Sequence, residues 1–91
     1  MSEANQKKRI AIFGSTGSIG TQALDVVRAH SEIFEVEILT AQANAELLIS
    51  QALEFMPNAV VIGNEEKYKE VKEALSDKGV KVFCGEKALE E

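Results

Sequence analysis

A glycine-rich segment near the start of the chain carries the residue types that bind phosphate groups. It reads Gly14-Ser15-Thr16-Gly17-Ser18-Ile19-Gly20 and directly follows the apolar run 10–13. Glycines at its first and fourth positions let the backbone turn sharply and bring N–H groups close to a pyrophosphate, and the hydroxyls would add donors. A helix that starts at this turn adds about half a positive charge. The segment therefore predicts a dinucleotide-binding turn.

The motif requires a buried strand before the turn and a helix after it. The unbroken apolar run 10–13 predicts a strand over 8–13 that is covered on both faces. Behind the turn, Gly20 would let helix and strand pack closely. The predicted inward face of this helix, from its apolar spacing, consists of Ile19, Ala23, Val26, Val27 and His30. The alternative is a turn that only caps the helix and binds no ligand.

The rest of the chain alternates strand and helix patterns. Strands are predicted over 34–39, 59–62 and 80–84, and helices after Asn44 and Asn64, whose side chains suit the N-cap position. Such alternation predicts an α/β fold: a parallel sheet of about four strands with helices on its faces. The predicted strand order is 4-3-2-1 along the sheet. Residues 1–7 are interpreted as a flexible leader, and a further helix would begin in 86–91.

The predicted domain, residues 8–91, is an incomplete one. A Rossmann-type dinucleotide-binding sheet has about six strands, and this chain supplies about four. The predicted order also leaves the most apolar strand at an uncovered edge, which natural sheets avoid. We therefore interpret the chain as part of a larger protein.

Composition excludes several classes of partner. The 91 residues carry a net charge of −5, whereas nucleic acids and anionic membranes require a basic surface. No apolar run approaches the 18 residues of a transmembrane helix. The single cysteine, Cys84, cannot form an internal disulfide, which fits a cytoplasmic protein.

The segment after the second predicted strand bears on the choice of cofactor. An acidic residue there usually binds the ribose of NAD, and a basic residue accepts the 2′-phosphate of NADP. Here the sequence reads Thr40-Ala41-Gln42-Ala43-Asn44, with neither kind of charge. The amides of Gln42 and Asn44, together with the backbone at Ala41, are the candidate contacts. This segment therefore permits NADP but does not by itself indicate NADP rather than NAD.

The sequence resembles the N-terminus of the 1-deoxy-D-xylulose 5-phosphate reductoisomerase family. The resemblance rests on the run 10–20 and on Leu24-Asp25-Val26-Val27-Arg28 one helix later. It continues through 39–41, Asn44, 54–57 and 83–85, and so covers essentially the whole chain. These motifs are much more specific than a glycine pattern alone.

The resemblance implies a function and a set of contacts. Family members rearrange 1-deoxy-D-xylulose 5-phosphate and reduce the product with NADPH to 2-C-methyl-D-erythritol 4-phosphate, in non-mevalonate isoprenoid biosynthesis. NADPH contacts carry over to Thr16, Gly17, Ser18, Ile19 and Asn44. Mg²⁺ or Mn²⁺ would be held by carboxylates beyond residue 91. A cytoplasmic homodimer is also implied.

Three consequences of the resemblance concern what this chain lacks. It would contain no catalytic residue and no metal ligand, so these 91 residues alone would be inactive. Many members have Gly-Lys where this chain has Gln42-Ala43, so the usual partner of the 2′-phosphate is missing. The Gln42 amide, or a residue beyond the chain, would take that role.

Two other functions remain open on the sequence alone. One is a stand-alone nucleotide-binding module without catalysis. The other is the start of a different NAD(P)-dependent reductase, such as a semialdehyde dehydrogenase or an extended short-chain reductase. Cys84 and Tyr68 stand in the wrong context for the catalytic residues of those enzymes, and His30 lies at the helix end away from the turn.

Overall fold

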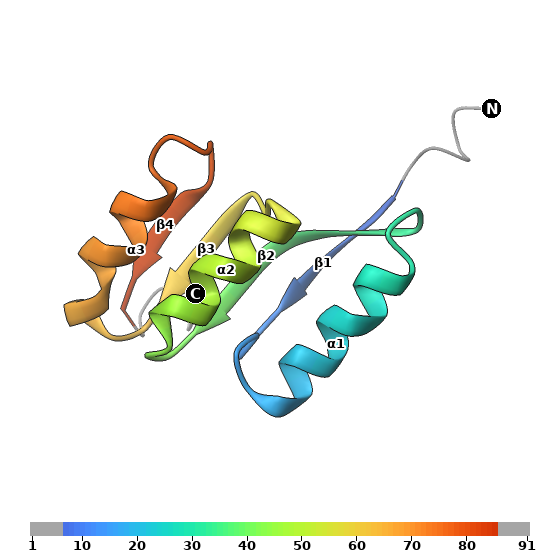
Figure 1. Cartoon of the computed structure of the whole chain (residues 1–91), viewed down its shortest axis with the longest axis horizontal. Helices are drawn as coiled ribbons and strands as arrows, with labels where there is room; N and C mark the ends of the chain where they lie inside the picture. Colours follow the sequence, from blue (N-terminus) through green and yellow to red (C-terminus); the bar gives the residue numbers. More distant parts are fainter. Residues whose placement is uncertain (1–6, 86–91) are drawn as a thin grey trace.

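The computed structural model describes residues 7–85, which form four strands and three α-helices in alternation (Figure 1). The interpretation of residues 1–7 as a leader falls, except for residue 7, outside the described residues, and so does that of 86–91 as a helix start. No helix within 7–85 is long and apolar enough to cross a membrane. The elements in chain order are β1 (Lys8–Ile12), α1 (Ser18–Ala29), β2 (Phe34–Ala41), α2 (Ala45–Phe55), β3 (Ala59–Ile62), the 3-10 turn η2 (Glu65–Lys67), α3 (Tyr68–Leu75) and β4 (Lys81–Cys84).

The strands form one parallel sheet in the order β1-β2-β3-β4. The predicted α/β class and strand order are confirmed, including the place of β4 beside β3. Leu39 of β2 pairs with Val60 of β3, which pairs with Val82 of β4. Between β1 and β2 the register shifts by one residue, so that Glu37 bulges out of the ladder. Because all strands are parallel, their carboxyl ends meet at one edge of the sheet.

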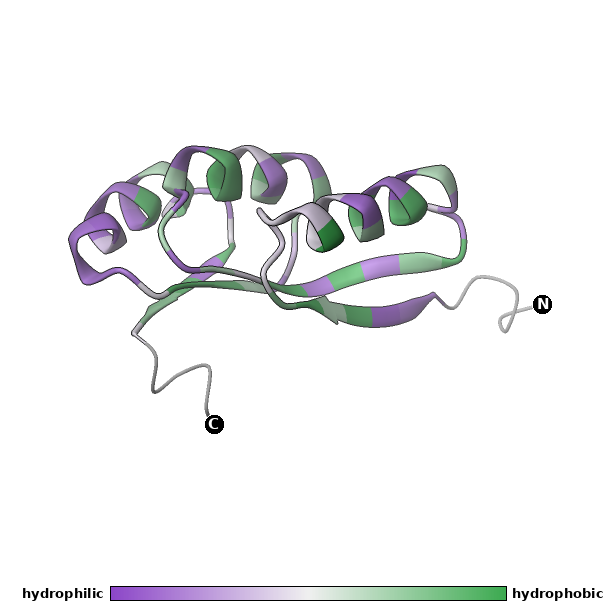
Figure 2. Cartoon of the chain, turned by 90° about the horizontal axis from the view of Figure 1, so that it is seen from below, coloured by the Kyte–Doolittle hydropathy of each residue, from purple (hydrophilic) through white to green (hydrophobic). Residues whose placement is uncertain are grey.

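The three helices cover the same face of the sheet (Figure 2). Successive right-handed crossovers that advance in one direction across a sheet place every helix on the same side. The core lies between this helix layer and the sheet, and its fully buried members include Leu24, Leu39, Leu48, Ile62 and Leu75. The predicted helices are present, and within residues 7–85 they all lie on one face of the sheet.

Strand β1 differs from its prediction. It ends at Ile12 rather than residue 13, and among its apolar residues only Ile12 is buried, while Ala11 is exposed. Phe13, just past the strand, is 68% exposed. Within residues 7–85, β1 is an edge strand, and helices cover only one of its faces, so the expectation of a strand covered on both faces is wrong for this part of the chain.

Helix α1 buries only part of the predicted face, since Val27 is buried and Ala23 is half-buried against the core. Its buried residues are Gly20, Leu24 and Val27, whereas Ile19 is 82% exposed and Val26 is 54% exposed. His30, at the C-cap, is exposed as well. The predicted face was wrong at Ile19, Val26 and His30, and the buried side instead includes Gly20, which packs against the preceding turn.

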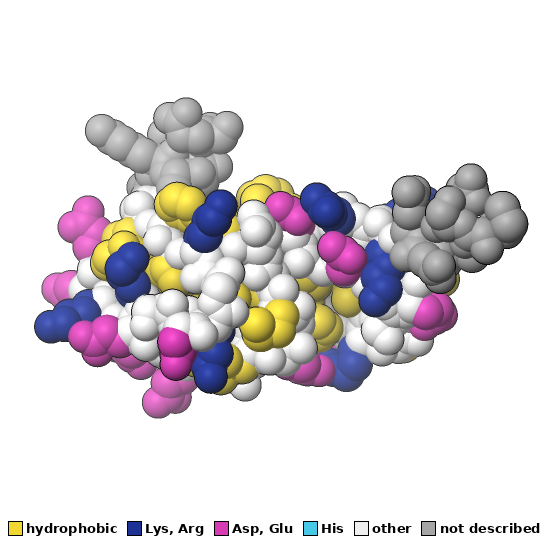
Figure 3. All heavy atoms as spheres, turned by 90° about the horizontal axis from the view of Figure 1, so that it is seen from above, with side chains coloured by type: hydrophobic (Ala, Val, Ile, Leu, Met, Phe, Trp, Pro, Cys, Tyr) yellow, Lys and Arg dark blue, Asp and Glu magenta, His cyan; other side chains and the backbone are white. Residues whose placement is uncertain are grey.

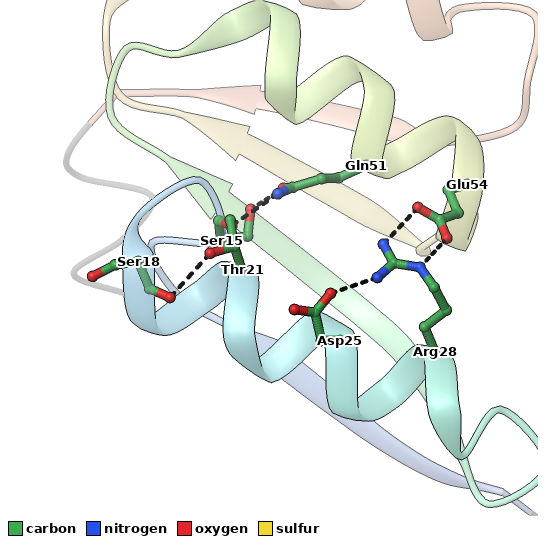
Figure 4. A network of polar contacts seen from close by, with 7 residues as sticks. All are labelled: Ser15, Ser18, Thr21, Asp25, Arg28, Gln51 and Glu54. Atoms are coloured by element: carbon green, nitrogen blue, oxygen red, sulfur yellow. Dashed lines mark hydrogen bonds and ion pairs between the residues drawn. The ribbon is translucent and has the colours of Figure 1, made fainter.

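An exposed ionic contact joins α1 to α2. Arg28 donates to both carboxylate oxygens of Glu54 and also to Asp25, one turn earlier (Figure 4). Its guanidinium lies 5.2 Å from the centroid of the Phe55 ring. The hydrogen bonds from Arg28 lower the pKa of Glu54 below its ordinary value. The contact therefore favours the folded state while Glu54 is ionised.

We expect this contact to make stability depend on pH in the acidic range. The lowered pKa of Glu54 contributes stability above the ordinary glutamate pKa of about 4.3, and the contribution is lost as the pH falls through the folded-state value. Glu54→Gln should therefore be less stable than the parent at neutral pH, with a difference that shrinks in acid. Urea unfolding between about pH 7 and about pH 3 measures it. Glu73→Gln, on the exposed side of α3, is the control, and an unchanging Glu54→Gln difference would refute the expectation.

Candidate functional site

The candidate site lies where the carboxyl ends of β1 and β2 meet the starts of α1 and α2. Figure 1 shows the turn after β1 and the start of α2 at the same edge of the sheet. Both helices direct their first N–H groups to this edge, where ligands bind in open α/β sheets. The glycine-rich turn and the segment after β2, predicted separately, are thus brought together.

The glycine-rich turn is fastened to β2 through its backbone. The Gly14 N–H donates to the Thr40 hydroxyl at 2.8 Å, and the Ser15 N–H donates to the Thr40 carbonyl at 2.7 Å. Gly14 has φ of +69°, a left-handed conformation that favours glycine. Gly17 closes the turn by donating to the Gly14 carbonyl at 3.0 Å.

The three glycines of the segment meet different constraints. A Cβ on Gly20 would lie 2.2 Å from the Gly14 carbonyl oxygen and 2.6 Å from the Ser15 Cα, so this position requires glycine for packing. A Cβ on Gly17 would meet only the Gly14 oxygen, at an ordinary 3.5 Å. Within the described chain, therefore, nothing sterically requires glycine at position 17, and the space beside it is free for a ligand.

Ser15 does not supply the hydroxyl donor that the sequence suggested. Its side chain is fully buried, and the hydroxyl donates to the Gln51 side-chain oxygen at 2.7 Å (Figure 4). Its backbone N–H is also committed, to Thr40. The hydroxyl is thus consumed by the contact between turn and α2, because a buried donor must find a partner inside the protein.

The groups left for a ligand begin at Thr16. Its side chain is half-buried, and Gly17, Ser18 and Ile19 are exposed. The first N–H groups of α1, at Ser18, Ile19 and Gly20, have no acceptor within the helix. In Figure 4 the Ser18 hydroxyl points away from the Ser15–Gln51 pair. Gly20 is buried, so the exposed donors at the positive end of α1 belong to Ser18 and Ile19.

The second half of the site follows β2. Ala41 is buried and its carbonyl accepts from the Gly63 N–H, so only its backbone can border a ligand. Gln42 is exposed, and its side chain lies over Gly63, where a Cβ would be 2.7 Å from the Gln42 side-chain oxygen. The Asn44 oxygen accepts from the Leu47 N–H at 3.2 Å, which confirms the predicted N-cap and leaves the amide NH₂ free for another acceptor.

Three residues of this region were not predicted: Thr40, Gln51 and Gly63. Gln51 lies on the buried side of α2, only 6% exposed, and a polar residue inside an apolar helical stripe was the available signal. The sequence gives no comparable signal for Thr40 and Gly63, because both act through hydrogen bonds to residues of other segments.

Other features of the described chain do not add chemistry to this site. Residues 7–85 hold no group of three or more His, Cys, Asp or Glu side chains that could bind a metal ion. A hollow of about 420 Å³ lies at the opposite edge of the sheet, among Arg9, Glu35, Glu37, Lys78 and Gly79. On the face drawn in Figure 3, acidic and basic side chains are interspersed rather than gathered in one patch.

Comparison with known proteins agrees with this geometry. The family model described as 1-deoxy-D-xylulose 5-phosphate reductoisomerase matches residues 10–91. The chain belongs to this family. It is 63% identical over 84 residues to the reductoisomerase of Bacteroides fragilis and 46% identical over 84 residues to that of Thermoanaerobacter pseudethanolicus. In both comparisons the matched region includes 92% of this chain and 22% of the relative's length.

Solved structures of the family share the fold. The reductoisomerase from Zymomonas mobilis in complex with NADPH superposes with a TM-score of 0.88 at 32% identity, covering 92% of this chain and 22% of that one. A reductoisomerase in complex with NADPH, fosmidomycin and magnesium gives 0.83 at 26% identity, covering 90% and 20%. The chain thus spans about a fifth of these reductoisomerases.

The packing at Gly20 gives a direct test of the turn's geometry. Gly20→Ala forces a Cβ into the backbone of the turn and should destabilise the protein by about 1–3 kcal/mol, the usual range for overpacking. Gly17→Ala is the matched control, since its Cβ meets no atom closer than 3.5 Å. Urea unfolding of both variants measures the difference. Equal stabilities would mean that the close approach at Gly20 is absent.

Proposed function

We propose that this chain is the NADPH-binding N-terminal portion of a 1-deoxy-D-xylulose 5-phosphate reductoisomerase, and that the whole enzyme makes 2-C-methyl-D-erythritol 4-phosphate for isoprenoid biosynthesis. The observation that carries the proposal is the turn at the start of α1. There, free N–H groups surround Gly17, a glycine that the described chain does not sterically require. A glycine is needed at position 17 if a ligand approaches the backbone there, because a larger side chain would block it.

The turn and the segment after β2 would bind different parts of the cofactor. N–H groups at Thr16, Ser18 and Ile19 would hold the pyrophosphate, helped by the positive end of α1. Past β2, the amides of Gln42 and Asn44 would reach the adenosine ribose and its 2′-phosphate. The exposed Ile19 side chain would cover one side of the bound cofactor, which accounts for an apolar residue 82% exposed on the protein alone.

The chemistry of the reaction belongs to the cofactor and to the rest of the enzyme. Bound NADPH supplies a hydride, and a divalent metal polarises the substrate oxygens. We place the metal ligands and the sugar-phosphate site in residues beyond this chain, so that these 91 residues alone are inactive. The Mg²⁺ and NADPH in the names of related structures support the use of both by the whole enzyme. A homodimer in the cytoplasm remains part of the proposal.

The sheet itself supports a larger assembly around this portion. Within residues 7–85, β1 has no partner on its outer side and one face of the sheet has no helix against it. Phe83 of β4 is half exposed, and Phe13 is more exposed still. Strands added beside β1 in a doubly wound sheet would bring their helices to the uncovered face.

Replacing Gly17 tests the proposed function most directly. Gly17→Val places a branched side chain where the pyrophosphate must approach, and should weaken NADPH binding by at least ~2 kcal/mol, about thirtyfold. Isothermal titration of the full-length enzyme measures the affinity.

The structure also supplies the control for this experiment. Gly17 has φ of −82° and ψ of 177°, an extended conformation that valine adopts, so the variant should fold. A thermal melt checks that it does. Unchanged NADPH affinity in a folded variant would show that the turn only caps the helix and does not bind the cofactor. If the parent enzyme itself does not bind NADPH, the proposed function is wrong.

The preference for NADPH over NADH can be tested at Gln42. Gln42→Asp puts a carboxylate beside the proposed 2′-phosphate, and like charges a few Å apart at an effective dielectric near 20 cost on the order of a few kcal/mol. NADPH binding should fall tenfold or more, while NADH binding holds or improves because the carboxylate accepts from the ribose hydroxyls. The measurement is kcat/KM for both cofactors at one salt concentration. An equal fall for both would place position 42 away from the ribose.

A further inference from the structure

The glycine-rich turn and helix α2 are joined by a buried pair of hydrogen bonds. The Ser15 hydroxyl donates to the Gln51 side-chain oxygen at 2.7 Å, and the Gln51 amide donates to the Ser15 carbonyl at 2.9 Å (Figure 4). Both residues are buried: Ser15 is not exposed at all, and Gln51 is 6% exposed. The hydroxyl and the carbonyl of Ser15 are thus both paired with the side-chain amide of Gln51.

Glutamine suits this position for a chemical reason. The turn presents one donor and one acceptor from the same residue, Ser15, and a primary amide offers one of each at a single end. Apolar residues of similar size would leave both groups of Ser15 buried without a partner. A carboxylate would accept from the hydroxyl but would face the Ser15 carbonyl with no proton to donate.

The pair also joins the two halves of the candidate site. Gln51 lies seven residues after Asn44, about 10 Å along the axis of α2. It thereby joins Ser15, the residue before Thr16, to the helix whose N-cap is Asn44. A polar link between α1 and α2, from Arg28 to Glu54, is exposed and lies at the far end of α1.

From this placement we propose that Gln51 is a positioning residue for the cofactor. It acts through Ser15 and sets the distance between the pyrophosphate donors at the turn and the ribose contacts at Gln42 and Asn44. The inference rests on the proposed NADPH function. A ligand that spans both halves of the site needs that distance, and a ligand that occupies one half does not.

The experiment compares a spanning ligand with a half-ligand in the full-length enzyme. Gln51→Met keeps the volume and removes both hydrogen bonds. NADPH should bind about tenfold more weakly to this variant, while adenosine 2′-phosphate, which occupies only the half after β2, should bind within twofold of the parent. Calorimetry gives both dissociation constants. Ser15→Ala, which removes one of the two bonds, should give a smaller loss for NADPH and serves if the methionine variant does not fold.

Val71→Ala is the control for stability alone. Val71 is fully buried on α3, which packs on α2 away from the turn, so its truncation destabilises the protein without touching the pair. Both dissociation constants should stay at the parent value in this variant.

Three outcomes would overturn the inference: unchanged NADPH affinity in Gln51→Met and Ser15→Ala, an equal loss for both ligands, or the same NADPH loss in Val71→Ala. Failure of the parent enzyme to bind NADPH would instead remove the proposed function. As a readout without cofactor, amide exchange at Gly14 and Ser15 should accelerate in Gln51→Met relative to Val71→Ala.

Discussion

The approach of helix α1 to the turn before it is the contact on which this structure depends. At Gly20 the helix comes so close that a Cβ would lie 2.2 Å from the Gly14 carbonyl oxygen. This contact fixes both the start of α1 and the side that it presents to the sheet. Leu24 and Val27 are therefore buried, and Ile19 is left exposed beside the turn. The helix start, with its free N–H groups, is held at the carboxyl edge of the sheet.

The turn divides its polar groups between structure and ligand. The N–H groups of Gly14 and Ser15 bind Thr40 of β2, and the Ser15 hydroxyl and carbonyl bind Gln51 of α2. Buried polar groups must be paired inside the protein, so this first part of the turn is committed to the fold. Farther along, Gly17, Ser18 and Ile19 are exposed. A short segment thus combines rigid support with an open donor surface, which suits it to hold a phosphate without rearrangement.

The segment after β2 is built differently. Ala41 is buried and hydrogen-bonded to Gly63, whereas Gln42 and Asn44 are exposed. Asn44 uses its oxygen to cap α2 and keeps its amide NH₂ outward. Neither residue carries charge, so recognition of a 2′-phosphate here would depend on neutral amide donors. That distinguishes this chain from the Gly-Lys pattern of the family that its sequence resembles.

The sequence by itself determined the order of elements, the parallel sheet with β4 beside β3, the N-cap of α2 at Asn44 and the glycine-rich turn. Asn64, predicted to cap the third helix, caps the 3-10 turn η2 that precedes α3. These follow from local signals: apolar runs, capping residues and glycines at fixed spacing. Only the tertiary structure decided the rotation of α1, the exposure of β1 and the loss of the Ser15 hydroxyl to Gln51. Each of these depends on a contact between segments, and Ser15 and Gln51 are 36 residues apart. Apolar spacing marks which faces of a helix can be buried, but the neighbour that packs closest selects the face that is.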